Sequence, residues 1–219
     1  MDLVFPPRCA SCDRLGEWLC DPCAAQMRRL PQPICRQCGL PARPPLCWRC
    51  RGSRSSLDGI RAFGYLEGTL RAAVHGLKYR GRRGSADALA GLLVQVLSRE
   101  PLPHDLIVPV PLHSDRKGER GFNQAELLAD ALALSTGRPV GREALFRVRD
   151  TLPQVRLGIA ERRRNVRGAF RASARAVAGR MVLLVDDVAT TGATLEACAR
   201  ALRADGAASV WGLVLARER

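Results

Sequence analysis

Residues 182–194 read VLLVDDVATTGAT, and this stretch decides the expected fold. Four apolar residues run directly into two adjacent acids, Asp186 and Asp187, and a short run of threonine, glycine and alanine follows. A short, continuously apolar run indicates a strand that is buried on both faces of a parallel sheet. Ligands of such sheets bind beyond the carboxyl ends of the strands, so we expect the two acids to face a ligand.

The small residues behind the acids suit a phosphate group; they are Ala189, Thr190, Thr191, Gly192, Ala193 and Thr194. They lead into a helix expected to start near Leu195, whose free N–H groups and dipole favour an anion. A ribose 5-phosphate fits both features, with its phosphate in the loop and its vicinal hydroxyls on the acids. The alternative is an ordinary strand–turn–helix junction, and neither the Walker A pattern nor the G-x-G-x-x-G fingerprint is present.

Strands and helices alternate through the rest of the chain, which predicts an α/β fold with a parallel sheet. Short apolar runs predict strands at 60–66, 106–110, 181–185 and 210–216. Apolar residues at helical spacing predict helices at 69–77, 86–97, 123–134 and from 195 to Gly206. Asn123 is the expected N-cap of the third helix.

Two other segments divide the chain. Residues 147–171 contain eight arginines and little periodicity, which predicts a mobile loop that closes over the site as a lid. The polar stretch RGSRSS at 51–56 has the composition of a linker and follows a segment rich in proline and cysteine. We therefore expect one domain at residues 1–57 and a second at residues 58–219.

Eight of the nine cysteines precede residue 51 and form four C-x-x-C pairs. Each pair can present two thiolates to one ion, and two pairs complete the tetrahedral sulfur shell that Zn²⁺ prefers. In chain order this predicts two closed structural zinc sites, Cys9/Cys12/Cys20/Cys23 and Cys35/Cys38/Cys47/Cys50. Because the segment has few large apolar residues, metal binding would supply the free energy that folds it.

Alternatives stay open for these cysteines. The same spacing permits an interleaved pairing of the C-x-x-C pairs. A disulfide framework would need an oxidising compartment, and redox chemistry would not need four copies of the motif. Cys198, far from the others on an apolar helix face, is expected to be a core residue.

The chain is strongly basic, with 219 residues and a net charge of +14. Such a field attracts polyanions, including nucleic acid, phosphorylated ligands and acidic lipid. All but two of the 35 basic residues are arginines, a skew that genome base composition can also produce. No apolar run approaches the roughly 20 residues that span a bilayer, and no signal peptide is evident, so we expect a cytoplasmic protein.

The stretch 182–194 resembles the phosphoribosyl pyrophosphate (PRPP) motif of type I phosphoribosyltransferases. Residues 107–124 (IVPVPLHSDRKGERGFNQ), residues 75–83 (HGLKYRGRR) and the C-x-x-C pairs make the whole chain similar to the ComF family. This resemblance implies a Rossmann-like core with a flexible hood and an N-terminal zinc-ribbon segment. It also implies PRPP and Mg²⁺ as ligands, and a role in natural competence, the uptake and handling of single-stranded DNA.

The resemblance also suggests a role for each site residue. Asp186 and Asp187 would hold the ribose hydroxyls, residues 190–194 would hold the 5-phosphate, and Mg²⁺ would offset the charge of the pyrophosphate. Basic residues would contact the pyrophosphate, in order of preference Arg116, Lys117 and Arg120, then Lys78 and Arg80. For each of these residues taken singly, a solvated surface position is the alternative.

Three functions are compatible with these residues. The first is a PRPP-binding competence protein that acts with single-stranded DNA and other competence proteins, although an aromatic content of 5% is low for base stacking. The second is an active phosphoribosyltransferase of nucleotide salvage, which works by positioning and charge stabilisation. The third is a PRPP-sensing regulator, because His75, His104 and His113 form no readable triad.

Overall fold

The computed structural model of the chain describes residues 6–112, 118, 121–149, 161 and 164–218. In chain order its helices and strands are α1 (Asp21–Gln26), β1 (Gly59–Tyr65), α2 (Gly68–Tyr79), α3 (Ser85–Arg99), β2 (Leu106–Pro109), α5 (Gln124–Thr136), β3 (Leu145–Arg147), β4 (Phe170–Ala172), α7 (Ala174–Val177), β5 (Met181–Ala189), α8 (Ala193–Ala204) and β6 (Ser209–Arg217).

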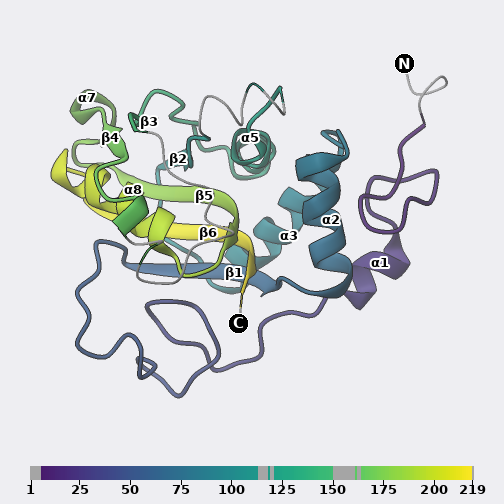
Figure 1. The fold of residues 1–219 in the computed structure, drawn as a ribbon, viewed down its shortest axis with the longest axis horizontal. Helices are drawn as coiled ribbons and strands as arrows, with labels where there is room; N and C mark the ends of the chain where they lie inside the picture. The colour runs from purple at the N-terminus through teal and green to yellow at the C-terminus, as the bar shows by residue number, and fades with distance from the viewer. Residues whose placement is uncertain (1–5, 113–117, 119–120, 150–160, 162–163, 219) are drawn as a thin grey trace.

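Parallel strands form the central sheet, in the order β1-β6-β5-β2 (Figure 1). β5 holds an inner position, with β6 on one side and β2 on the other. Parallel neighbours need crossover connections, which helices supply in this chain. The predicted α/β class with a parallel sheet is therefore confirmed.

The apolar run of β5 is buried on both faces, as predicted. Leu183 and Val185 pack into one core with residues of α2, α3 and α5. Val182 and Leu184 pack into a second core with residues of α8, including the fully buried Cys198. Helices therefore cover both faces of the sheet, and Cys198 is a core residue as expected.

β5 is longer than its apolar run. The sequence predicts an end at Val185, but the strand continues to Ala189, because β6 pairs with it as far as Arg217. Asp186 and Asp187 therefore lie inside the strand and not beyond its end.

The helices lie close to their predicted positions. Asn123 caps α5 as expected, and its side-chain oxygen accepts the amide of Ala125 at 3.0 Å. α8 ends before Gly206, whose φ of 91° is the left-handed conformation that stops a helix. Within the described residues, no helix combines the length and the apolar composition needed to cross a bilayer.

Both ends of the arginine-rich segment 147–171 are strands, so the prediction of a loop throughout is wrong there. β3 and β4 pair antiparallel, with Leu145 opposite Ala172. Leu145 and Phe170 are buried in the core that α8 also lines. These strands are too short to show a hydrophobic period, and most of the chain between them lies outside the described residues.

The cysteine-rich segment covers the open edge of the sheet, which β1 forms. An uncovered edge strand would expose unpaired backbone groups. Here the amide of Leu30 donates to the carbonyl of Phe63 at 3.2 Å, and the amide of Ile60 donates to the carbonyl of Gln37 at 2.9 Å. Figure 1 shows that the segment spreads along the core, with its start beside α2 and its second half below β1.

Candidate functional site

Residues 189–194 join the end of β5 to the first turn of α8, and we call them the phosphate loop because the sequence predicts that they hold a phosphate. Gly192 is the N-cap of α8 and has a φ of 79°, a conformation that favours glycine. A Cβ at this position would lie 3.1 Å from Cδ1 of Ile60, so the loop backbone packs closely on the core. The amide of Ala193 donates to the hydroxyl of Thr191 at 3.3 Å. Because α8 begins at Ala193, earlier than predicted, the end of the loop lies in its first turn, where an anion is favoured.

The two acids leave β5 on opposite faces, because side chains alternate along a strand. Asp187 is 2% exposed, and its Oδ2 lies 2.6 Å from Nζ of Lys78, which extends from α2. Oδ1 of Asp186 accepts the amide of Asp187 at 2.8 Å. One acid is therefore neutralised by a lysine, while the other is bound to a backbone amide.

Burial changes the ionisation of this group of residues. The pKa of Asp186 rises well above its usual value because the carboxyl is buried and because Asp187 adds a like charge nearby. Burial alone would lower the pKa of Lys78, but the Asp187 carboxylate outweighs burial and raises it. Lys78 therefore stays charged, and Asp186 takes up a proton more readily than an ordinary aspartate does.

These groups open into one pocket of about 460 Å³, a volume typical of small-molecule sites. β5 and the phosphate loop form one wall, and α2 supplies Lys78 on another. Of the predicted binding residues, those that line it are Asp186, Asp187, Ala189, Thr190, Gly192, Ala193, Thr194 and Lys78.

The remaining predicted residues are placed elsewhere or lie outside the described part. Thr191 does not line the pocket, and its hydroxyl accepts a loop amide. Arg80 is exposed at the C-terminal end of α2 and does not line it either. The first-choice pyrophosphate contacts, Arg116, Lys117 and Arg120, lie outside the described residues.

Two more cations line the pocket: Arg71, which the sequence did not point out, and Arg147, the first residue of the segment predicted to close over the site. Arg71, His75 and Lys78 lie on one face of α2, at positions i, i+4 and i+7. Because residues seven positions apart lie on one face of a helix, the predicted role of Lys78 would also have predicted Arg71 as a pocket residue. Arg147 comes from β3, and only the folded chain singles it out among the described arginines of its segment as a pocket residue.

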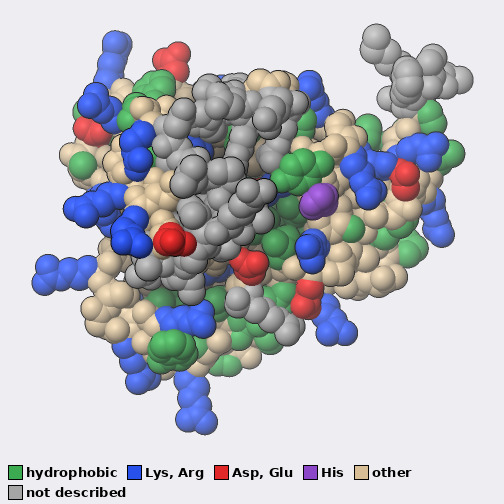
Figure 2. Space-filling model, viewed as in Figure 1, with side chains coloured by type: hydrophobic (Ala, Val, Ile, Leu, Met, Phe, Trp, Pro, Cys, Tyr) green, Lys and Arg blue, Asp and Glu red, His purple; other side chains and the backbone are tan. Residues whose placement is uncertain are grey.

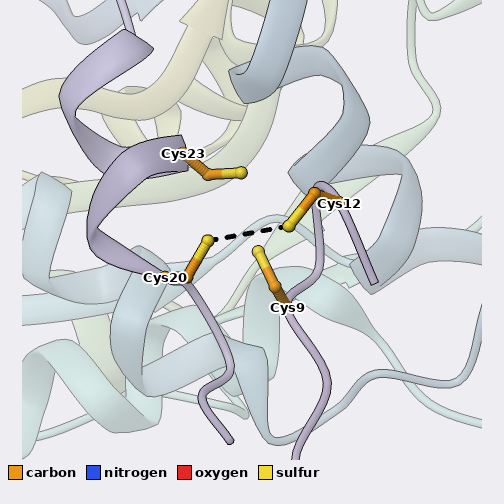
Figure 3. Close-up of side chains that lie close together, drawn as sticks. All are labelled: Cys9, Cys12, Cys20 and Cys23. Atoms are coloured by element: carbon orange, nitrogen blue, oxygen red, sulfur yellow. Dashed lines mark hydrogen bonds between the residues drawn. The ribbon is translucent and has the colours of Figure 1, made fainter. Parts of the chain in front are cut away.

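The first cysteine cluster consists of Cys9, Cys12, Cys20 and Cys23, which point toward one another (Figure 3). Their sulfur atoms all lie within 4.8 Å of one another, and those of Cys12 and Cys20 are 3.6 Å apart. Four Zn–S bonds of about 2.3 Å in a tetrahedron would place sulfur atoms about 3.8 Å apart. The donor set and its spacing fit a zinc ion.

The second cluster has the same form and consists of Cys35, Cys38, Cys47 and Cys50. The sulfur atoms of Cys38 and Cys47 are 3.8 Å apart, and the amide of Cys47 donates to the sulfur of Cys35 at 3.3 Å. All described cysteines are free thiols. The two clusters follow chain order, as predicted, and are not interleaved.

The first cysteine of each cluster has a lowered pKa, which favours metal binding. Burial would raise the pKa of Cys9, but backbone N–H groups of neighbouring residues lower it to about 6. The pKa of Cys35 is lowered to about 6 in the same way. Both are therefore thiolates near neutral pH, the form that binds zinc.

Comparisons with known sequences agree with these two parts. The family model of the double zinc ribbon domain matches residues 1–51, and that of the phosphoribosyl transferase domain matches residues 119–219. "DNA utilization protein YhgH" of Salmonella typhi is 38% identical over 220 residues, which cover 95% of this chain and 96% of that protein. "Competence protein F" of Haemophilus influenzae is 32% identical over 209 residues, covering 90% of each chain. "Competence protein ComFC" of Bacillus subtilis is 31% identical over 214 residues, covering 92% of this chain and 85% of that one.

The chain belongs to the ComF family. The fold expected from that resemblance is confirmed: this ComF protein joins a type I phosphoribosyltransferase core to N-terminal zinc-ribbon sites. In it the acids lie within β5 and the phosphate loop follows that strand, while the zinc ribbons lie along an edge of the sheet and along α2.

Proposed function

We propose that this ComF protein binds PRPP with Mg²⁺ in the pocket at the end of β5 and acts in natural competence, in the cytoplasm. The observation that carries the proposal is that one pocket holds two acids, a phosphate loop at a helix N-terminus, and cations from other elements. In this reading residues 1–57 form the zinc-ribbon domain and residues 58–219 the PRPP-binding domain.

Each chemical group of PRPP matches residues in one part of the pocket. The 5-phosphate suits the loop at 190–194, and the ribose hydroxyls suit Asp186 and Asp187. The pyrophosphate suits Lys78, together with Arg71 and Arg147 from the same pocket. Carboxylate oxygens are donors that Mg²⁺ prefers, so the acids fit an ion that offsets the pyrophosphate charge. Arg116, Lys117, Arg120 and Arg80 remain proposed as further contacts.

The ion pair between Lys78 and Asp187 implies an exchange of partners. A ribose hydroxyl on Asp187 would replace the ammonium group, and Lys78 would turn to the pyrophosphate. The lysine would therefore keep the buried acid neutralised without ligand and stabilise the ligand when it is bound.

Titration calorimetry with PRPP and Mg²⁺ tests the site. Asp186→Asn is expected to weaken binding about 10-fold or more, because Mg²⁺ beside the ligand would keep this carboxylate ionised, and a hydrogen bond to a charged group is worth about 1.5–3 kcal/mol. The control is Asp87→Asn, an exposed acid of α3 away from the pocket, which should bind as wild type does. Equal affinity of Asp186→Asn and wild type would contradict the proposal.

The same variant separates loss of binding from loss of fold. In the folded chain the pKa of Asp186 is raised, so the unfolding free energy of wild type should fall as pH rises from about 4 toward that pKa. Asp186→Asn should lack this fall and be more stable than wild type at pH 7. Urea unfolding at several pH values measures this effect. A variant that binds poorly because it is misfolded would be less stable, not more.

Turnover distinguishes an enzyme from a sensor. Release of pyrophosphate from PRPP with a nucleobase would show a phosphoribosyltransferase of nucleotide salvage. Tight binding of PRPP without release of pyrophosphate with any nucleobase would favour a PRPP-sensing regulator.

A second function, binding of single-stranded DNA, is favoured by the surface of the second zinc ribbon. Trp48 is 78% exposed there, and Cζ of Arg49 lies 5.0 Å from its ring. Residues 35–57 contain five exposed arginines and no acid: Arg36, Arg43, Arg49, Arg51 and Arg54. Lys and Arg side chains also project around this face of the molecule (Figure 2). An exposed aromatic ring among cations suits a base and its phosphates.

Fluorescence tests this second function, because a base that stacks on Trp48 should quench its emission. Affinity for an oligothymidine should fall steeply with salt, since phosphate contacts release counterions. Binding without quenching would place the DNA elsewhere, and no binding at low salt would contradict DNA binding by this chain.

A further inference from the structure

Arg217 is a buried cation at the end of β6 that does not line the ligand pocket. The residue is 2% exposed, and its Nη1 donates to the carbonyl of Ala189, the first residue of the phosphate loop, at 3.0 Å. A Cβ on Gly192, near the helical end of the loop, would lie 3.7 Å from the same Nη1. One guanidinium group therefore lies against both ends of the phosphate loop.

A guanidinium group buried in this way needs an opposite charge nearby. Among the described residues its Nε has no hydrogen-bond partner, and the guanidinium group forms no ion pair with a carboxylate. Burial lowers the pKa of Arg217, and the charges that oppose this effect are those of Cys38 and Cys50. Both belong to the second cysteine cluster, and Figure 1 shows the C-terminal end of the chain beside the loops below β1.

We propose that the second zinc site positions the phosphate loop through Arg217, so that zinc at this site and a phosphoryl ligand at residues 189–194 strengthen each other's binding. A zinc ion with four thiolates has more negative than positive charge, which makes it a suitable counter-ion for a buried guanidinium group. Arg217 is a positioning residue here, because it contacts the backbone of the loop and not the ligand. The identity of the phosphoryl ligand in this coupling rests on the proposed function.

A second path of contacts joins the same two places through Ile60. The amide of Ile60 donates to the carbonyl of Gln37, which lies between two zinc ligands. Gly39 packs so closely on Ile60 that a Cβ would lie 2.2 Å from the carbonyl oxygen. The side chain of Ile60 in turn packs against Gly192 in the phosphate loop. The zinc knuckle is thus in contact with the loop through one residue of β1.

The sign of the coupling follows from what zinc loss would do. Without the ion nothing would hold the four sulfur atoms of the second cluster together, and the knuckle that contacts Ile60 through Gln37 and Gly39 would loosen. With this packing lost, the guanidinium group would be expected to move toward water. It would then release the carbonyl of Ala189, and the loop would lose a contact that holds its shape.

The first zinc site provides an internal control. Its neighbouring arginine, Arg82, donates to the carbonyl of Cys9 at 2.8 Å and pairs with Asp13. None of these residues lines the pocket, and none contacts the phosphate loop through a described hydrogen bond. Zinc at the first site should therefore not respond to a ligand in the pocket.

The coupling is measured with ribose 5-phosphate as the probe and the full chain loaded with two zinc ions. Competition with a chromophoric chelator gives the affinity of each zinc site with and without the probe. In wild type the probe should raise the affinity of one site about 10-fold, within the usual range for coupled sites, and reciprocally zinc should raise affinity for the probe. Arg217→Met should abolish this effect, Arg217→Lys should restore part of it, and Arg82→Met should leave it as in wild type.

Hydrogen exchange of the phosphate-loop amides tests the same coupling without any ligand. Cys50→Ser, which breaks the second site, should speed exchange at residues 189–195 several-fold, whereas Cys12→Ser, which breaks the first site, should not. If Cys50→Ser does not fold, Arg217→Met with both zinc ions bound decides the question by the same measurement.

The outcomes separate this coupling from the proposed function. If the loop responds to the second zinc but wild type binds neither ribose 5-phosphate nor PRPP, PRPP binding is wrong and the positioning role of the zinc site stands. If the ligands bind, but zinc affinity and loop exchange are the same in wild type and Arg217→Met, the coupling is overturned while PRPP binding stands.

Discussion

The two zinc ribbons of this chain share a metal-binding pattern but differ in their surroundings. Their spacings are nearly equal, C-x2-C-x7-C-x2-C and C-x2-C-x8-C-x2-C. Between its first and last cysteine the first ribbon holds three acids and one arginine, whereas the second holds three arginines and no acid. The ligand set therefore determines the local fold of each ribbon, while the residues between the ligands determine what the ribbon does.

The first ribbon is docked on a helix of the core. Ala10 is a fully buried member of the main core, and it lies so close to α2 that a Cβ on Gly76 would be 2.4 Å from its carbonyl oxygen. Trp18 packs against Gly84, just before α3. The contacts of this ribbon are structural.

The second ribbon is docked on the edge of the sheet, next to the phosphate loop. Arg61, which is 4% exposed, ties it down by donating to the carbonyl of Arg36 at 3.0 Å and to Glu100 at 2.7 Å. The rest of its surface is basic and carries the exposed Trp48. It is thus attached to the core on the side where the proposed ligand binds, and it leaves cations free to meet a polyanion.

Matched glycine substitutions give the largest expected difference between the ribbons. Gly39→Ala places a Cβ 2.2 Å from the carbonyl oxygen of Ile60 and requires a φ of 70° from a residue with a side chain. It should lower the free energy of unfolding by about 3 kcal/mol, because the steric clash adds to a backbone strain of about 1–2 kcal/mol in the left-handed conformation. Gly76→Ala also clashes, but it gains about 1 kcal/mol of helix propensity and should cost less. Urea unfolding of both zinc-loaded variants measures the difference.

The same two variants also separate the functions of the ribbons. Gly39→Ala should weaken binding of ribose 5-phosphate, because Ile60 lies between Gly39 and Gly192. Gly76→Ala should bind it as wild type does. Equal effects of the two substitutions on binding would remove the distinction between the ribbons.

Substitution of one ion-pair partner at each ribbon should give an intermediate effect. Glu100→Gln leaves the buried Arg61 without its counter-ion and should cost about 2–3 kcal/mol of unfolding free energy, since uncompensated buried charges are expensive. Asp13→Asn leaves Arg82 its bond to Cys9, and Asp13 is half exposed, so the cost should stay below about 1 kcal/mol. Asn also tolerates the φ of 69° at this position.

Salt dependence checks the origin of these two effects. In 1 M NaCl the Asp13→Asn difference should largely vanish, because exposed charges are screened, whereas the Glu100→Gln difference should persist. A Glu100→Gln variant as stable as wild type would mean that Arg61 does not hold the second ribbon in place.

Much of the fold could be predicted because it depends on local patterns. The run Val182–Val185 is apolar without interruption, and Asn123 is a residue type that caps helices well. The four C-x-x-C pairs can combine into two zinc sites in only a few ways. These features need only neighbouring residues, and the structure confirms them.

The parts of the site that could not be predicted depend on contacts between distant segments. The continuation of β5 through the acids depends on pairing with β6, which the apolar run alone does not reveal. The pairing of Asp187 with Lys78 depends on where α2 packs. Arg217 is the end of an apolar strand in the sequence, and only the folded chain shows that it is buried and donates to the first residue of the phosphate loop.

The smallest expected effect on stability compares one tryptophan from each ribbon. Trp48→Ala should change the free energy of unfolding by less than about 0.5 kcal/mol, because the ring is 78% exposed. Trp18→Ala should cost about 2 kcal/mol, less than a fully buried ring, because Trp18 is half-buried against Gly84. The order should reverse for an oligothymidine at low salt, where loss of one stacked base should cost about 1–3 kcal/mol of binding in Trp48→Ala only. Trp48→Phe should retain most of the affinity, since it keeps a stacking surface. If Trp18→Ala weakened DNA binding as much as Trp48→Ala, both losses would come from a general change in the fold. The proposal that the second ribbon has a separate DNA-binding surface would then be wrong.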